Sequence, residues 1–271
     1  WEKFWWAVRP NGCLAAAREL QQRGQVGSVG FSTHGTTDLI TSALEHEGDG
    51  GFDYVNLHWY FITQRHQPAL DVATQRDIGV FIISPADKGG RLYEPPQKLV
   101  DLCAPLHPLV FNNAWCLANP QVHTLSLGAA RPSDFNPVPD SLAALEHPEL
   151  LAAIEQRLHA AMRDVTGVDH PDELWQGLPD FAVAPGFVNL RVITWLRGLV
   201  LGWDMEKYAQ GRYRMLGTAE DWFPGLNAAH ATELDFAAAV RESPFADQIP
   251  SWLAETHLML GGESIARLSE S

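Results

Sequence analysis

The sequence has few cysteines and few basic residues, and both shortages exclude classes of protein. Its three cysteines, Cys13, Cys103 and Cys116, lie far apart, so they suit neither a disulfide framework nor a CxxC metal pair. Such cysteine usage is typical of a reducing cytosol, and we expect a cytoplasmic protein. Acidic residues (33) outnumber lysines and arginines (19), and the net charge of −14 argues against a nucleic-acid partner.

Long apolar runs are also missing. No stretch approaches ~18 uninterrupted apolar residues, and no basic start is followed by an apolar run, so we expect no membrane segment and no signal peptide. The sequence begins with Trp1 rather than methionine, and WEKFWWAV is unusually aromatic for a chain end. We therefore expect a chain that was cut out of something longer.

What the sequence does contain is a regular alternation of strand-like and helix-like segments. Units of about 25–30 residues, each with polar residues just after its strand, predict an α/β fold with a parallel sheet. They favour a TIM-type (β/α) barrel over a Rossmann sheet, because no GxGxxG follows any strand. A closed barrel has eight strands. We thus expect an N-terminally incomplete barrel of about four βα units. The predicted strands are residues 26–31, 54–60, 80–84 and 122–127, and the predicted helices are 12–23, 36–44, 67–76, 95–103 and 110–117.

The alternation of strands and helices ends near Pro137 and Pro139, and we interpret these two prolines as a hinge. Beyond them the apolar spacing is helical, and tryptophans recur that we interpret as core residues. We predict two domains, the barrel part at residues 1–136 and an all-α C-terminal extension at residues 137–271. Helices are expected in the extension at residues 141–163, 188–201, 204–216, 233–241 and 249–260.

One segment, GVFIISPADKGGRL at residues 79–92, combines an apolar run with a polar, glycine-bearing loop. The run suits a strand buried on both faces, and such strands carry ligand sites at their carboxyl ends. Gly89 and Gly90 either turn the chain or leave backbone N–H groups open to an anion. Lys88, which lies between the strand end and the glycines, favours the second alternative.

Four motifs, GxVGxxGFSTH at residues 24–34, YVNLHWY, GVFIISPADKGGRL and HTLSLGAARPSD, together resemble the C-terminal half of an aldo/keto reductase over residues 12–134. AWCL at residues 114–117 resembles the helix that precedes the last strand of that family. The resemblance implies an eight-stranded barrel that holds NADPH across its strand ends and reduces aldehydes or ketones by hydride transfer. The helical tail is similar to that of a bacterial branch of oxidoreductases, some of which carry an iron–sulfur cluster on a cysteine-rich tail. No cysteine follows Cys116 here, so no cluster is expected.

By the same resemblance, the cofactor contacts fall on the four strand ends. Ser32 and Thr33 would hold the nicotinamide carboxamide, and His58 would stand where the family has a glutamine, with Asn56 as the alternative at that position. A loop-to-helix turn at the last strand would favour the 2′-phosphate of NADP(H), and Asp134 would bind the ribose or adenine. The other implied contacts are Ser84, Pro85, Asp87, Lys88 and Gly89, which would line the pyrophosphate and ribose loop, and Gly128, Ala129 and Arg131 at the 2′-phosphate.

The family's catalytic Asp, Tyr, Lys and His cannot be placed on this sequence, so no catalytic residue is predicted and the chain alone is expected to be inactive. The partner of the active protein would be a small-molecule carbonyl substrate, and the oligomeric state is not predicted. The alternative is a non-catalytic relative that binds a nucleotide or a protein. No metal site is expected, because His107 and His123 do not reach ligand spacing with the cysteines. His34 is interpreted as a polar loop residue, with a residue of the substrate site as the alternative.

Overall fold

The structure is a computed structural model that describes residues 2–129, 131–219 and 223–265. Their contacts divide them into two compact units, one formed by residues 1–89 and 109–148 and the other by residues 90–108 and 149–271. The units therefore differ from the predicted domains, because residues 90–108 group with the helical extension and residues 137–148 group with the sheet. No helix within the described ranges is long and apolar enough to span a membrane.

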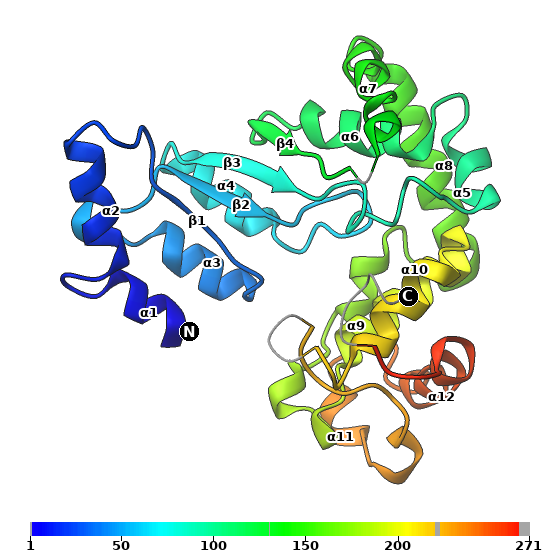
Figure 1. The fold of residues 1–271 in the computed structure, drawn as a ribbon. Helices are drawn as coiled ribbons and strands as arrows, with labels where there is room; N and C mark the ends of the chain where they lie inside the picture. The colour runs from blue at the N-terminus through cyan, green and yellow to red at the C-terminus, as the bar shows by residue number, and fades with distance from the viewer. Residues whose placement is uncertain (1, 130, 220–222, 266–271) are drawn as a thin grey trace. The chain divides into compact units, whose positions relative to one another are not determined.

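The first unit is built on four parallel strands in the order β1-β2-β3-β4 (Figure 1), which confirms a parallel α/β sheet. Each strand is joined to the next by at least one helix, as parallel neighbours require. The elements are α1 Glu2–Val8, α2 Cys13–Gln22, β1 Gly30–Ser32, α3 Thr37–Leu44, η1 Gly48–Gly50, β2 Tyr54–Leu57, α4 Gln67–Gln75, β3 Gly79–Ile83, α6 Pro108–Ala118, β4 Thr124–Ser126, η2 Pro132–Phe135 and α7 Val138–Ala144.

The strands are shorter than the apolar runs predict. β1 begins at Gly30 rather than residue 26, because its partner β2 begins only at Tyr54, opposite Gly30. A Cβ atom at Gly30 would lie 2.5 Å from the Tyr54 carbonyl oxygen, so this close pairing depends on glycine. Residues 26–28 are exposed and precede the sheet.

The sheet is buried on one face only. Val55, Leu57, Val80 and Ile82 are fully buried, whereas the residues that alternate with them, such as Tyr54 and Phe81, are half-buried. The expectation that residues 80–83 form a strand buried on both faces is therefore wrong for this structure. The physical reason is the period of two along a strand, which sends alternate side chains to a face that the described helices cover less completely.

An ion pair fastens α2 to the start of β2. The Arg18 guanidinium lies 2.8 Å from Asp53 Oδ2 and donates to the Gly51 carbonyl oxygen at 2.7 Å. The same carboxylate accepts from the Val29 amide at 2.7 Å. Although burial opposes it, the pKa of Asp53 is lowered by the hydrogen bonds from Val29 and Arg18 and by the charge of Arg18. The bridge therefore holds α2, the start of β1 and the start of β2 together.

The second unit is helical, with α9 at its centre, packed against η3, α10 and α12 (Figure 1). Asn189 begins α9 by accepting from the Val192 amide, and Asp204 ends it in the left-handed conformation. Trp203 donates from Nε1 to the Leu158 carbonyl oxygen at 2.9 Å, which fixes α9 against α8. The elements are α5 Gln97–Cys103, α8 Pro148–Thr166, η3 Pro171–Trp175, η4 Phe181–Val183, η5 Pro185–Phe187, α9 Leu190–Trp203, α10 Glu206–Met215, η7 Ala231–Glu233, α11 Ala237–Val240 and α12 Ile249–Leu260.

Two of the predicted helices differ from the structure. The single helix expected over residues 141–163 is interrupted at residues 145–147, and α8 begins at Pro148. Proline has no N–H and cannot continue a preceding helix, so it starts a new one. The helix expected over residues 233–241 is only the short α11, which follows the turn η7.

Candidate functional site

The candidate site lies at the carboxyl edge of the sheet, where four loops meet. All four strands are parallel, so Ser32, Leu57, Ile83 and Ser126 end them on the same side. The register places Ser32 opposite Asn56 and Ile83 opposite Ser126. Polar residues that follow different strands are thereby gathered at one edge, which is where open α/β sheets bind ligands.

Lys88 stands at the middle of this edge. Its Nζ atom lies 3.1 Å from His34 Nε2 and 3.3 Å from His58 Nε2, and so links the loops that follow β1, β2 and β3. The two imidazole rings lie 4.8 Å apart between centroids. Of these three residues, Lys88 and His58 are predicted cofactor contacts, whereas His34 is interpreted as a polar loop residue, with a substrate-site role as the alternative.

A tight turn after β3 brings Lys88 back to the sheet edge. Ser84 has a left-handed backbone (φ 54°), and its carbonyl oxygen accepts from the Lys88 amide at 3.0 Å. A Cβ atom at Gly89 would lie 2.0 Å from the Pro85 carbonyl oxygen, so only glycine fits there. The first alternative for Gly89, that it turns the chain, is sufficient to explain why the residue is glycine.

The side chain of a buried asparagine is hydrogen-bonded to the backbone of this turn. Asn112 on α6 donates from Nδ2 to the Pro85 carbonyl oxygen at 3.2 Å, and its Oδ1 accepts from the Phe61 amide at 3.2 Å. It is 3% exposed. The sequence did contain a signal for this contact, because Asn112 is a polar residue within the apolar helix PLVFNNAWCLA. A polar side chain that is buried needs hydrogen-bond partners elsewhere in the fold.

Tyr60 sets the protonation of His58. A carbonyl oxygen can only accept, so the Tyr60 hydroxyl donates its proton to the Ile83 carbonyl oxygen. The hydroxyl oxygen then accepts from His58 Nδ1, which lies 2.6 Å away. This arrangement leaves His58 Nε2 as the acceptor of a neutral ring, facing the Lys88 ammonium. Tyr60 was not among the predicted site residues, because only the fold returns its hydroxyl to the end of β3.

Other predicted residues lie at the end of β1, within β2 and after β4. Ser32 is exposed, and Thr33 Oγ1 accepts from the Gly35 amide at 3.0 Å. Within the described ranges no hydrogen bond of these two side chains reaches another strand-end loop. Asn56 lies inside β2, on the half-buried face, whereas His58 lies beyond the strand end.

After β4, Gly128 and Ala129 are exposed, and a Cβ atom at Gly128 would meet nothing within 4 Å. Arg131 and Asp134 pair with each other around the four-residue turn η2. The Asp134 carboxylate accepts from the Arg131 amide at 3.0 Å and lies 3.4 Å from Arg131 Nε. Asp134 is buried, so its cap explains its presence without a ligand.

Other titratable groups of the sheet unit serve the core. Burial raises the pKa of the Cys116 thiol, and His123 Nδ1 accepts from the Val80 amide at 3.0 Å. In the other unit burial raises the pKa of Cys103 to about 12. Both thiols stay protonated at neutral pH, a state that binds metal poorly. In the part of the chain that the structure describes, no group of three or more His, Cys, Asp or Glu side chains could hold a metal ion.

Comparison with known proteins adds little. No protein-family model matches the sequence, and no curated protein matches it. Among solved structures, the chain is similar to the aldo-keto reductase AKR11C1 from Bacillus halodurans in its holo form, with 17% sequence identity and a TM-score of 0.42. The similarity covers 53% of this chain and 54% of that one, so the chain spans about half the length of that structure. A likeness this distant assigns no residue of the site.

Proposed function

We propose that the sheet edge binds a nicotinamide dinucleotide and that the chain is the cofactor side of an NAD(P)H-dependent oxidoreductase of the aldo/keto reductase type. In this proposal the four strands belong to a TIM-type barrel, and the substrates are small aldehydes or ketones. One observation carries the proposal, namely the ammonium of Lys88 between His34 and His58 where the strands end.

The residues at the edge fit the chemical groups of such a cofactor. A cation suits a pyrophosphate, and the ammonium of Lys88 is the cation at the end of β3. Hydroxyl groups pair with both the donor and the acceptor of an amide, and Ser32 and Thr33 offer two of them. Room beside Gly128 suits a close approach of a ligand to the backbone. When bound, the cofactor supplies a hydride to a carbonyl carbon.

The preference for NADP(H) over NAD(H) rests on Arg131, whose side chain is 70% exposed beside Asp134. An exposed guanidinium can form bidentate hydrogen bonds with a phosphate monoester. Asp134 caps η2, and we propose that its carboxylate also contacts the ribose of the cofactor.

We further propose that this chain does not reduce a carbonyl by itself. Tyr60 is the tyrosine connected to Lys88 through His58, yet its proton is engaged by the Ile83 carbonyl oxygen and the residue is 1% exposed. A general acid must present its proton to the substrate, so Tyr60 is a positioning residue here. The role of the sheet edge in this proposal is therefore to bind and orient the cofactor.

The experiment is a titration of the 271-residue chain with NADPH, followed by the fluorescence of the reduced nicotinamide. Saturable binding is expected, and Lys88→Ala is expected to weaken it at least tenfold, which corresponds to about 1.4 kcal/mol. Lys207→Ala is the matched control, because Lys207 pairs with the exposed Glu94 in the other unit. Arg131→Ala should weaken NADPH binding and leave NADH binding unchanged.

No binding of NADPH or NADH would overturn the proposal, and so would equal affinities of the Lys88 and Lys207 variants. Oxidation of NADPH by this chain with a simple aldehyde would contradict the proposal that the chain does not reduce a carbonyl by itself. Binding without oxidation, also in any longer product of the same gene, would instead favour a non-catalytic nucleotide-binding protein.

A further inference from the structure

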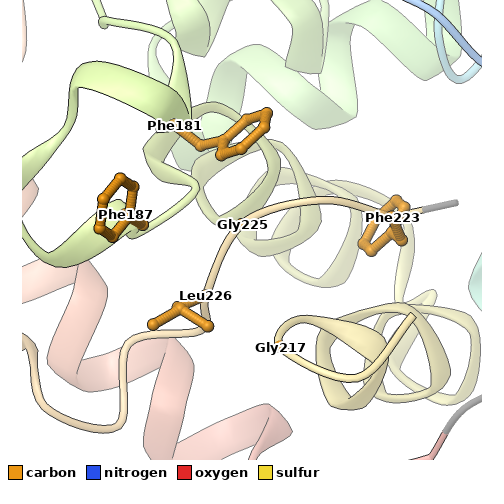
Figure 2. Close-up of a pocket in the computed structure, with 6 residues that line it drawn as sticks. All are labelled: Phe181, Phe187, Gly217, Phe223, Gly225 and Leu226. Atoms are coloured by element: carbon orange, nitrogen blue, oxygen red, sulfur yellow. The ribbon is translucent and has the colours of Figure 1, made fainter. Parts of the chain in front are cut away.

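The helical unit contains an apolar pocket that the proposed function does not use. It has a volume of about 320 Å³, near the lower end of the ~300–1,000 Å³ typical of small-molecule sites. Figure 2 shows two phenylalanines reaching it from the η4–η5 segment and the other side chains coming from the chain around Gly225. The lining residues are Phe181, Phe187, Gly217, Phe223, Gly225 and Leu226.

Hydrogen bonds between its two walls hold the pocket open. The Leu226 amide donates to the Phe187 carbonyl oxygen at 2.8 Å, and the Asn189 amide donates to the Leu226 carbonyl oxygen at 2.9 Å. Asn189 Nδ2 also donates to the Pro224 carbonyl oxygen at 2.8 Å. Because these bonds join the segments before α9 and after α10, the pocket is formed in advance of any ligand.

Phe187 lies in the left-handed region (φ 57°), which a phenylalanine rarely adopts, and the residue is 61% exposed. The core therefore gains little from this ring, although the backbone is strained to present it. Backbone strain of this kind is concentrated at binding sites. Strain and exposure together indicate that the ring serves a ligand.

Arg212 is the second and independent observation. It lies on α10, is 9% exposed, and its guanidinium carbon packs 5.4 Å from the ring centre of Tyr208 and 5.6 Å from that of Phe223, a pocket residue. Its Nε atom is buried without a hydrogen-bond partner. Among the residues that the structure describes, no acceptor or carboxylate pairs with this side chain.

Three other partly buried arginines of the unit, Arg191, Arg197 and Arg214, differ from Arg212. Each of the three has an oxygen partner within hydrogen-bond distance, although Arg214 Nε, like Arg212 Nε, is buried without one. Arg212 packs against aromatic faces, which compensate a buried charge in part. Those partners are Leu178 O for Arg191, the Glu255 carboxylate for Arg197 and Gly261 O for Arg214.

We propose that the pocket and Arg212 form a binding site for a small organic monoanion, a carboxylate that carries an apolar aromatic or aliphatic body. The apolar body packs among the phenylalanine rings, and the carboxylate pairs with the guanidinium beside Phe223. A monoanion matches the one guanidinium that packs against a ring of the pocket among the described residues, that of Arg212 on Phe223. The net charge of −14 also disfavours a polyanion. This site is independent of the cofactor proposal.

The test is isothermal titration calorimetry of the full chain with 3-phenylpropionate and with its neutral counterpart 3-phenylpropan-1-ol. Saturable binding of the carboxylate tighter than about 1 mM is expected, with at least a tenfold preference over the alcohol. Arg212→Met should reduce the carboxylate affinity to that of the alcohol. Arg241→Met is the control, because Arg241 is exposed and pairs with Glu242. Equal affinities of acid and alcohol, or an unchanged preference in Arg212→Met, would overturn the proposal.

A second pair of variants decides the question if Arg212→Met does not fold. Leu226 lines the pocket and is 46% exposed, whereas Leu258 on α12 is 86% exposed and does not line it. Leu226→Ala should weaken binding of both probes several-fold, and Leu258→Ala should leave both unchanged. The same affinities in the two leucine variants would rule out this pocket as the site.

Discussion

The carboxyl edge of the sheet and the pocket of the helical unit solve the placement of a charge in opposite ways. At the sheet edge, His34 and His58 accept hydrogen bonds from Lys88. Tyr60 then connects His58 to the backbone carbonyl oxygen of Ile83. In the helical unit, Arg212 is surrounded by rings. The polar network at the sheet edge is satisfied by its own side chains, whereas Arg212 keeps a buried Nε atom without an oxygen partner, which the proposed carboxylate would supply.

The largest expected effect tests how rigidly the sheet edge is built. Gly89→Ala should lower the free energy of unfolding by about 3 kcal/mol, because the new Cβ would lie 2.0 Å from the Pro85 carbonyl oxygen and force the turn to move. Urea unfolding measures the loss. Gly128→Ala is the matched control, with an expected change within about 0.5 kcal/mol, since its Cβ would meet nothing. Equal losses would show that the turn at Gly89 is not tightly packed.

A second prediction concerns His66, a buried histidine of the sheet unit that lies outside the proposed site. Burial, helped by the charge of Arg65, lowers the pKa of His66 to about 3. The unfolded chain therefore binds the proton more tightly. The stabilisation is complete above pH ~6.5 and is lost as the pH falls, by about 2 kcal/mol between pH 6.5 and 5.

His66→Asn should remove that part of the acid sensitivity in urea unfolding at both pH values. His230→Asn should retain it, because the His230 side chain is 81% exposed. If the two variants lose stability with falling pH to the same extent, His66 is not the neutral core histidine that the structure indicates.

Tyr60→Phe tests the relay at the sheet edge. The change removes the donor to the Ile83 carbonyl oxygen and the acceptor for His58 Nδ1, so a loss of about 1.5 kcal/mol is expected. NADPH affinity should also fall, because the His58 ring is no longer held with Nε2 toward Lys88. Unchanged NMR shifts of the His58 ring nitrogens in the variant would argue against the relay.

The smallest expected effect concerns the helical pocket. Phe187→Gly relieves a left-handed backbone, and this gain offsets the entropy that glycine loses on folding, so stability should stay within about 0.5 kcal/mol. Phe181, which has no such backbone, should lose about 2 kcal/mol on the same change. Thermal unfolding compares the two. A large loss in Phe187→Gly would make the ring a core residue and remove the contrast between the two regions.

Prediction from the sequence succeeded where the pattern is local. The alternation of apolar and helical segments predicted four strands, and all four are present in parallel order. Strand ends were predicted less well, because pairing with β2, not the length of the apolar run, decides where β1 begins. Lys88 and His58 were predicted as site residues because each follows a strand, and the structure brings their side chains within 3.3 Å of each other. Their role in a site stays a prediction. The cofactor contacts and the barrel stay predictions.

The sequence alone determined that strands alternate with helices, that polar residues follow the strands, and that a glycine follows Lys88, since these depend on neighbours within a few positions. Three contacts form only in the folded chain: His34 meets Lys88 across 54 positions, Tyr60 returns to Ile83, and Arg212 packs on Tyr208 and Phe223. Local periodicity determines only which face of an element is buried. Which distant side chain that face meets depends on register and packing, and these exist only once the whole chain is folded.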